Sequence, residues 1–260
     1  MATLNGSPVT AQELEQLALT NYGHFTSMRL SAGTVPGLSL HLDRLRRDCR
    51  EVFAVDLDTD LVRRFVRQAV GGDGGELTVR VTIFDPALGL GNIADDAVPQ
   101  VLVTTRPAGT MPPPALTAKT FVFSRDSPGT KHIGLFSQLR LRREAQRQGY
   151  GDVIFVEPDG QVSEGATWNL GFVTEEGTVV WPRAPVLPGV TMRLLQGVHD
   201  DTVVAPVPLA DLSTMRAAFA TNVSIGVRAI SRIDDVELDV DDPILETLRK
   251  EYAELPGETL

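Results

Sequence analysis

The order of the predicted strands constrains the fold most, because the strands follow one another in hairpins instead of alternating regularly with helices. Residues 76–85 (ELTVRVTIFD) and 98–106 (VPQVLVTTR) alternate apolar and polar side chains, as half-buried strands do. Residues 151–165 (GDVIFVEPDGQVSEG) have a hairpin pattern with the turn at 158–160. Hairpins with interspersed helices favour mixed sheets, so we predict an α+β fold.

Helices are predicted where apolar residues recur at helical spacing. They cover about 41–53, 59–70 and 135–148, and a further helix starts near 187–189. Residues 10–13 (TAQE) have the capping-box pattern that opens a short helix.

Glycine and proline mark the turns between these elements. The cluster 71–75 (GGDGG) is expected to end the second helix, and 107–120 (PAGTMPPPALTAKT) is typical of a loop. Residues 25–31 and 36–40 bracket a glycine-containing turn and favour a hairpin.

Residues 124–130 (SRDSPGT) are the best candidate for a domain boundary. We therefore expect a smaller N-terminal α/β domain over 1–123, an interdomain loop over 124–130 and a larger C-terminal domain over 131–260. The sequence has no GxGxxG motif after a strand, no GxxxxGK[ST] and no GxSxG. A dinucleotide-binding fold, a P-loop and a serine-hydrolase site are therefore not supported.

Composition excludes several classes of function. The formal net charge of −10 argues against sequence-independent nucleic-acid binding, which depends on neutralising phosphates. No run approaches the roughly 20 apolar residues of a membrane span, and the N-terminus lacks the pattern of a signal peptide, so we expect a cytoplasmic protein without a membrane partner. The single cysteine, Cys49, precludes an intramolecular disulfide, and the four histidines show no metal-ligand spacing.

Lysine is rare in this chain. Of the 24 basic residues, only Lys119, Lys131 and Lys250 are lysines. Arginine stays protonated and cannot form an imine, whereas a desolvated lysine can lose its proton and do so. Lys131, in GTKHIG between a boundary loop and a helix, is placed as an imine-forming lysine must be. A surface lysine is the ordinary alternative.

Three further features suit a phosphate-bearing aldehyde cofactor. Glu164 follows the hairpin and suits a pyridine nitrogen that must stay protonated. The turn at 187–191 (LPGVT) opens a helix whose free backbone N–H groups and threonine hydroxyl favour a phosphate. Arg44 can bind a phosphate bidentately, although Arg46 and Arg47 are equally placed by spacing alone. Taken singly, these features are also typical of a strand end, an N-cap turn and a solvated helix face.

Together these features resemble class IV aminotransferases, the fold-type IV pyridoxal 5′-phosphate (PLP) enzymes. That family includes branched-chain aminotransferase, D-amino-acid aminotransferase and aminodeoxychorismate lyase. Its central signature is a lysine, a helix ending in EA-x-x-x-G, a strand, a D-x-G turn, V-x-EG and an asparagine. The matching residues here are Lys131, Glu144, Ala145, Gly149, Asp159, Gly160, Val162, Glu164, Gly165 and Asn169. HLDRL around Arg44 is similar to the family's H-x-x-RL, and LPGVTMRLL is similar to its LPG-[IV]-T-R.

The resemblance implies a two-domain enzyme with PLP in the cleft between the domains. Lys131 would hold PLP as a Schiff base and shuttle the proton, and Glu164 would pair with the pyridine nitrogen. Phosphate binding is implied for Arg44, Val190, Thr191, Asn222, Val223 and Ser224. Substrate contacts are implied for Arg80, which would meet a carboxylate, and for the pocket residues Tyr22 and Phe25. The resemblance also brings Arg125 toward the cofactor's phenolic oxygen, whereas Asn169 is interpreted as structural.

The implied reaction is transamination between an amino acid and a 2-keto acid by a homodimer. Aminodeoxychorismate lyase, which releases pyruvate and 4-aminobenzoate, is the alternative, and a non-catalytic binding protein on the same fold is the second. His132 directly after Lys131 is typical of the lyase branch, whereas GYGDVIF and LPGVT are typical of the transaminase branch. Residues 21–25 are shorter than the family's corresponding segment, and Thr26 stands where glutamate is common.

Overall fold

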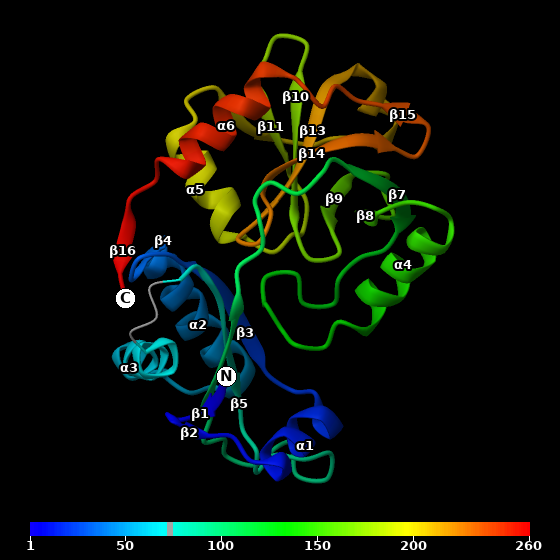
Figure 1. The fold of residues 1–260 in the computed structure, drawn as a ribbon. Helices are drawn as coiled ribbons and strands as arrows, with labels where there is room; N and C mark the ends of the chain where they lie inside the picture. Colours follow the sequence, from blue (N-terminus) through cyan, green and yellow to red (C-terminus); the bar gives the residue numbers. More distant parts are fainter. Residues whose placement is uncertain (72–74) are drawn as a thin grey trace. The chain divides into compact units, whose positions relative to one another are not determined.

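The computed structural model describes residues 1–71 and 75–260, whose elements separate into two units (Figure 1). The first unit contains residues 1–109, 130–134 and 256–260. The second unit contains 110–129 and 135–255. Of the segment expected as an interdomain loop, 124–129 belong to the second unit and Thr130 to the first.

The first unit is built on an antiparallel sheet of five described strands. Its strands and helices are β1 (Ala2–Leu4), β2 (Ser7–Pro8), α1 (Ala11–Thr20), β3 (His24–Leu30), β4 (Thr34–Pro36), α2 (Leu38–Phe53), α3 (Thr59–Val70), β5 (Leu77–Phe84), β6 (Gln100–Pro107) and β16 (Gly257–Thr259). The strand order is β2-β1-β6-β5-β3, and β16 pairs separately with β4.

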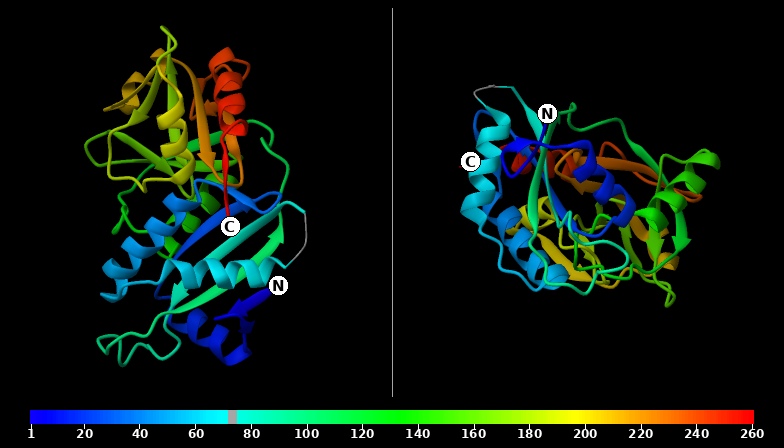
Figure 2. Two further views of the ribbon diagram at one scale, coloured as in Figure 1. Left: turned by 90° about the vertical axis from the view of Figure 1, so that its left-hand side faces the viewer. Right: turned by 90° about the horizontal axis from the view of Figure 1, so that it is seen from below.

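The core of the first unit lies between this sheet and helices α2 and α3. Both helices lie along one face of the sheet (Figure 2). Period-two alternation sends Val79, Val81 and Ile83 of β5 to that face, where they pack against apolar residues of α2 and α3. The intervening residues, among them Arg80 and Thr82, therefore point to the opposite face.

The caps of the helices agree with their sequences. Thr10 and Glu13 form the predicted capping box at the start of α1. Helix α3 has the predicted bounds, with Asp58 accepting hydrogen bonds from two first-turn amides. Gly71 is its C-cap, and residues 72–74 of the predicted glycine terminator lie outside the described residues.

The second unit contains a mixed sheet of nine described strands. Its elements are β7 (Leu116–Val122), α4 (Phe136–Arg147), β8 (Asp152–Val156), β9 (Val162–Gly165), β10 (Asn169–Thr174), β11 (Val179–Pro182), α5 (Val190–Val198), β12 (Thr202–Ala205), the 3₁₀ helix η1 (Leu209–Thr214), β13 (Met215–Asn222), β14 (Gly226–Ile233), β15 (Val236–Glu237) and α6 (Pro243–Ala253). The order is β12-β11-β10-β13-β14-β7-β8-β9, and β15 pairs with β14.

The sheet contains both parallel and antiparallel pairs, and β11 runs parallel to β12. β7 runs parallel to both β14 and β8, while β8–β9, β10–β11, β10–β13 and β13–β14 are antiparallel. Helices α5 and α6 pack on β13 and β14 through Leu195, Leu245 and Leu248, and α4 packs on β7 and β8. The predicted α+β fold with mixed sheets is therefore confirmed.

Two local predictions were wrong. Residues 36–40 do not form a strand, because α2 begins at Leu38, directly after Gly37 with its positive φ of 66°. Apolar and polar residues alternate in 38–42 (LSLHL), as they do in a strand. Leu38, Leu42 and Leu45 are nevertheless spaced so that they lie on the buried face of the helix. Residues 107–120 are not all loop either, because Leu116 begins β7, which is held between β14 and β8.

Candidate active site

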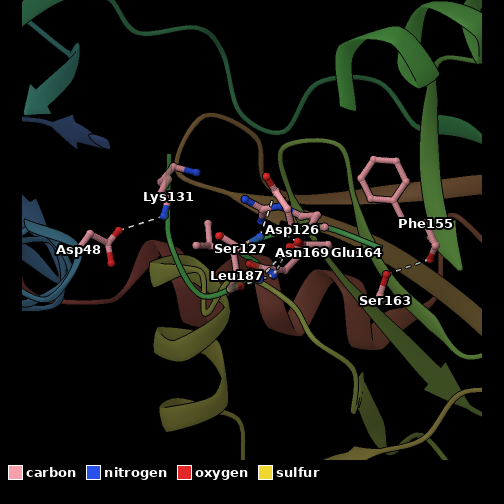
Figure 3. A network of polar contacts seen from close by, with 10 residues as sticks. Asp48, Asp126, Ser127, Lys131, Phe155, Ser163, Glu164, Asn169 and Leu187 are labelled. Carbon is pink, nitrogen blue, oxygen red and sulfur yellow. Dashed lines mark hydrogen bonds and ion pairs between the residues drawn. The ribbon is translucent and has the colours of Figure 1, made fainter. Parts of the chain in front are cut away.

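Lys131 lies on a short extended segment whose backbone is bonded on two sides. Its N–H donates to Oδ2 of Asp48 (3.0 Å, Figure 3), and its carbonyl accepts from the N–H of Phe25 (2.9 Å). The N–H of Ile133 donates to the carbonyl of Gly23 (3.0 Å), so the segment runs along the start of β3. The side chain is half-buried, with Nζ 4.9 Å from the centroid of the Phe25 ring. The backbone is thus held while the residue as a whole stays partly exposed.

Asp48 is the anchor of that segment and was missed in the sequence. Its side chain is 1% exposed, and its second oxygen, Oδ1, accepts from Nε (3.0 Å) and Nη2 (2.7 Å) of Arg47. Each carboxylate oxygen therefore has its own donor, which compensates the buried charge. The available signal was an aspartate on the apolar face of α2, between Leu45 and Cys49.

Helix α2 distinguishes Arg44 from the two neighbouring arginines. Arg44 is 6% exposed, and its Nη2 donates to the hydroxyl of Thr26 and lies 3.2 Å from Nδ1 of His41. Arg46 and Arg47 are 41% and 47% exposed and pair with Asp43 and Asp48. The structure therefore places only Arg44 of these three in the buried cluster, a choice that spacing left open.

Two buried histidines accompany Arg44 in the first unit. Burial lowers the pKa of His24 to about 4, with Arg44 and Arg47 adding to the shift and Asp48 opposing it. Burial also holds the pKa of His41 well below its ordinary value, and the charges of Arg44 and Lys131 act in the same direction. Both imidazoles are therefore neutral at pH 7.

Glu164 lies in the second unit, at the end of β9, where three donors converge on its carboxylate. Nη1 of Arg125 donates to Oε1 (2.9 Å), and the N–H of Leu187 (3.2 Å) and Nδ2 of Asn169 (3.3 Å) donate to Oε2 (Figure 3). The two ion-paired side chains are 5% and 9% exposed. The carboxylate is consequently held in one orientation. Arg125, expected at a phenolic oxygen, is in this structure the ionic partner of Glu164.

Asn169 has the structural role that was predicted for it. Its Nδ2 also donates to the carbonyl of Leu187 (2.7 Å), which fixes the turn before α5. A Cβ on Gly189 would lie 1.9 Å from Oδ1 of Asn169, so this close approach requires glycine.

The start of α5 presents backbone donors without a side-chain cap. Gly189 is the N-cap and makes no side-chain capping bond, and Val190 and Thr191 begin the helix in buried positions. First-turn N–H groups have no partner within a helix and carry the positive end of its dipole. The hydroxyl of Thr191 lies 3.4 Å from that of Tyr252 on α6, a neighbour that sequence reasoning missed. This arrangement suits a phosphate group.

Asn222 ends β13 and builds the turn that follows. Its Oδ1 accepts from the N–H of Ser224 (2.8 Å) and of Ile225 (3.2 Å), and its Nδ2 donates to the carbonyl of Thr167 (3.1 Å). Val223 and Ser224 are half-buried in this turn. Its side-chain bonds therefore give Asn222 a turn-forming role in the segment predicted to bind phosphate.

Arg80 lies at a hollow of about 300 Å³ in the first unit. The other lining residues are Leu14, Leu17, Ala18, Asn21, Thr82, Leu102, Thr104 and Ile133. Its guanidinium carbon lies 3.6 Å from the centroid of the Phe25 ring, its Nε donates to Thr82 (3.2 Å), and burial lowers its pKa. The Phe25 ring thus contacts both Arg80 and Lys131. Tyr22 instead bonds the carbonyl of Val52 (2.9 Å) and packs edge-on against Phe53.

Other kinds of site have no support in the described part of the chain. Among residues 1–71 and 75–260, no group of three or more histidine, cysteine or acidic side chains is arranged to hold a metal ion. No helix of the described residues has the length and apolar character needed to cross a membrane. Cys49 is fully buried, and burial together with the charge of Asp56 raises the pKa of its thiol to about 11. This thiol is therefore packing and not a nucleophile.

Comparison with known proteins gives the family. No curated protein matches the sequence. The fold matches a hypothetical aminotransferase from Mycobacterium tuberculosis in its PLP-bound form (TM-score 0.82, 21% identity, 97% of each chain covered). It also matches branched-chain aminotransferases from Thermoproteus uzoniensis (TM-score 0.86, 19% identity, 97% of this chain and 93% of that chain) and Escherichia coli (TM-score 0.83, 19% identity, 100% and 95%). Residues 23–233 match the model of the amino-transferase class IV family. The chain therefore belongs to the class IV aminotransferases and has their fold.

Proposed function

We propose that this protein transfers an amino group between an amino acid and a 2-keto acid. Pyridoxal phosphate is the cofactor of the family to which the chain belongs. The observation that carries the proposal is Lys131, whose backbone is hydrogen-bonded to Asp48 and Phe25 while the residue as a whole stays half-buried. An amine that bonds covalently to a cofactor needs both properties.

The residues present fit the phosphate of this cofactor. The start of α5 offers the N–H groups of Val190 and Thr191, and Gly189 before them carries no side chain. Arg44 supplies a buried guanidinium. We propose these groups as phosphate ligands, together with the turn at Asn222–Ser224.

Glu164 fits the ring nitrogen. Its carboxylate is 5% exposed and is oriented by Arg125, Asn169 and a backbone amide. A buried carboxylate beside a pyridine nitrogen favours the protonated ring. When bound, the cofactor supplies a carbonyl carbon that takes up the amino group and a ring that delocalises the electrons released at the substrate's Cα.

Lys131 and Arg80 then have separate tasks. Nζ of Lys131 would hold the cofactor and would carry the proton from the substrate's Cα. Arg80 orients the substrate through a carboxylate, and its place in the hollow supports this task. Because the guanidinium donates to the neutral hydroxyl of Thr82 and, among the described residues, forms no ion pair, its positive charge suits a ligand carboxylate. Phe25 holds the guanidinium plane by stacking.

The second candidate is the lyase reaction on aminodeoxychorismate. His132 directly after Lys131 supports it, and it uses the same lysine attachment. A non-catalytic binding protein on the same fold is the third candidate, supported by the short segment at 21–25. We also propose a homodimer, which light scattering tests.

Covalent attachment is tested first, because this chain has only three lysines. We expect added PLP to give a visible absorption band in the parent protein and in Lys250→Ala, whose side chain is 74% exposed. Lys131→Ala should show no such band. After borohydride reduction and digestion, the added mass should lie on the peptide that contains Lys131. A band in Lys131→Ala, or the mass on Lys119, would contradict the assignment.

The loaded protein then separates the three candidates. An amino acid supplied without a keto acid should convert the cofactor to its amine form if the protein is a transaminase. Release of 4-aminobenzoate from aminodeoxychorismate would identify the lyase. A loaded protein that does neither with a panel of amino acids would be a binding protein.

A further inference from the structure

A buried polar cluster surrounds one end of the Arg44 guanidinium. Thr26 on β3 and His41 on α2 are both fully buried, and Arg44 is 6% exposed. The hydroxyl of Thr26 lies 2.7 Å from Nδ1 of His41 and accepts from Nη2 of Arg44, which is also 3.2 Å from the same Nδ1. His41 and Arg44 are three positions apart on α2, so they share one face of the helix.

The direction of each hydrogen bond follows from what the groups can donate. Arginine has only donors, so both Thr26 Oγ1 and His41 Nδ1 must accept from Nη2. Nδ1 therefore carries no proton, and its single lone pair is shared between the Thr26 hydroxyl at 2.7 Å, which donates to it, and the more distant Nη2 at 3.2 Å. The order is Arg44 to Thr26 to His41, with the imidazole proton on Nε2. Because a hydroxyl can accept and donate together, Thr26 joins the other two groups.

The state of His41 agrees with this order. A second proton on the ring would place a donor at Nδ1, facing the donors of Arg44. Burial and the charges of Arg44 and Lys131 keep the pKa of His41 well below its ordinary value, so the ring stays neutral. Its Nε2 is buried and makes no hydrogen bond within the described residues, which leaves Nδ1 as the anchoring atom.

Thr26 adds no charge to this cluster. A carboxylate there would place a negative charge beside the guanidinium and oppose an anion. The threonine hydroxyl fixes one nitrogen of Arg44 without adding charge. An arginine held in this way loses less side-chain freedom when it binds an anion than one that must be ordered on binding.

We propose that Thr26 and His41 are positioning residues, which hold Arg44 in the orientation in which it binds the phosphate of PLP. This inference rests on the proposed function, since it takes Arg44 to be a phosphate ligand. The two residues touch neither the substrate nor the reacting atoms in this role. They act only through the guanidinium, so their effect is specific for the phosphate.

The test compares PLP with pyridoxal, which has a hydroxyl in place of the phosphate. Thr26→Val removes the hydroxyl at nearly constant volume, and Thr26→Ser restores it. We expect Thr26→Val to bind PLP about tenfold more weakly, as for the loss of a hydrogen bond to a charged group. Its affinity for pyridoxal should equal that of the parent protein, and Thr26→Ser should recover most of the PLP affinity. If valine is not accommodated, Thr26→Ala makes the same comparison.

A matched control is available in the same unit. Thr3 is 6% exposed, and its hydroxyl has no hydrogen-bond partner within the described residues. Thr3→Val should therefore leave both affinities unchanged. A double-mutant cycle with Arg44→Met tests the route of the effect. In the Arg44→Met background, Thr26→Val should not weaken PLP binding further.

The outcomes separate this inference from the proposed function. Parent protein that does not attach PLP at Lys131 overturns the proposed function and the inference with it. Attachment in the parent protein with unchanged PLP affinity in Thr26→Val overturns the inference alone. Equal loss for PLP and pyridoxal, or a further loss in the Arg44→Met background, also overturns it, because the effect would then be general destabilisation of the unit.

Discussion

His24 makes the stability of the first unit depend on pH. The imidazole is fully buried, lies near the ring of Phe53, and has neither nitrogen hydrogen-bonded within the described residues. Its pKa is lowered from 6.5 to about 4, first by burial. In the unfolded chain the ordinary pKa returns. Between pH 6.5 and about 4, the unfolded state therefore binds a proton that the folded state does not.

The sign and the size of the effect follow from this difference. The stabilising contribution is fully present above pH 6.5 and is lost as the pH falls toward the folded-state pKa. Each pKa unit corresponds to about 1.4 kcal/mol, so the whole loss is about 3 kcal/mol. From pH 7 to pH 5, the free energy of unfolding should fall by about 2 kcal/mol through His24 alone. His41 adds a parallel loss, because its pKa is lowered as well.

The perturbation that isolates His24 is His24→Leu. Leucine has a similar volume, and the substitution removes no hydrogen bond within the described residues. Its stability at pH 7 should lie within about 1 kcal/mol of the parent value, since a buried polar group without a partner is itself unfavourable. At pH 5 the variant should be more stable than the parent by up to about 2 kcal/mol. Urea unfolding of the cofactor-free protein at both pH values measures this difference.

Met28→Leu is the matched control for this experiment. Met28 is a buried residue of the same strand, and the swap nearly conserves volume. It should keep the parent's pH dependence. If His24→Leu loses as much stability between pH 7 and pH 5 as the parent protein does, then His24 does not titrate as argued, and the reasoning from its burial fails.

Three further predictions concern other parts of the molecule. Gly189→Ala should weaken PLP binding at least tenfold, because its Cβ would meet a side-chain oxygen 1.9 Å away and displace the first turn of α5. Gly197→Ala on the same helix has open space around its Cβ and should leave PLP binding unchanged. A cofactor titration compares the two variants. Glu164→Gln should cost about 3 kcal/mol in urea unfolding even without cofactor, because it removes the carboxylate charge that faces the buried guanidinium of Arg125. A loss below about 1 kcal/mol would refute a structural role for this pair. Cys49 should resist alkylation at pH 8 in the folded protein and react only after unfolding, as mass spectrometry would record.

Much of the fold could be predicted because local patterns and tertiary packing agree. Helix α3 has a capping aspartate, an apolar stripe and a terminal glycine, and its bounds are those predicted. Prediction from the local sequence pattern failed where that pattern and the tertiary packing favour different structures. LSLHL alternates like a strand over five residues, and only packing over the longer stretch to Phe53 makes it a helix. Strand β7 follows three prolines and is stabilised by neighbours far along the chain.

The residue types of the candidate site could be recognised in the sequence, but their contact partners could not. A lysine, a carboxylate and a glycine turn can each be recognised by type. The carboxylate of Asp48 could not be assigned to the amide of Lys131, 83 positions away, because no local spacing encodes that pairing. The same holds for Arg125, whose bond to Glu164 spans 39 positions. The sequence could not distinguish Arg44 from Arg46 and Arg47, because it does not show which side of α2 is buried.

The path of the chain between the two units has a consequence for synthesis. Residues 130–134 join the first unit after 110–129 have entered the second, and 256–260 return to pair with β4 after the second unit is complete. A growing chain exposes its N-terminal part first. The first 109 residues therefore emerge with Arg44 and Asp48, before the segment with Lys131 has been synthesised and can pair with β3. Lys131 therefore reaches its place along β3 only in the second half of translation, and a C-terminal truncation that removes β16 would leave β4 without this partner strand.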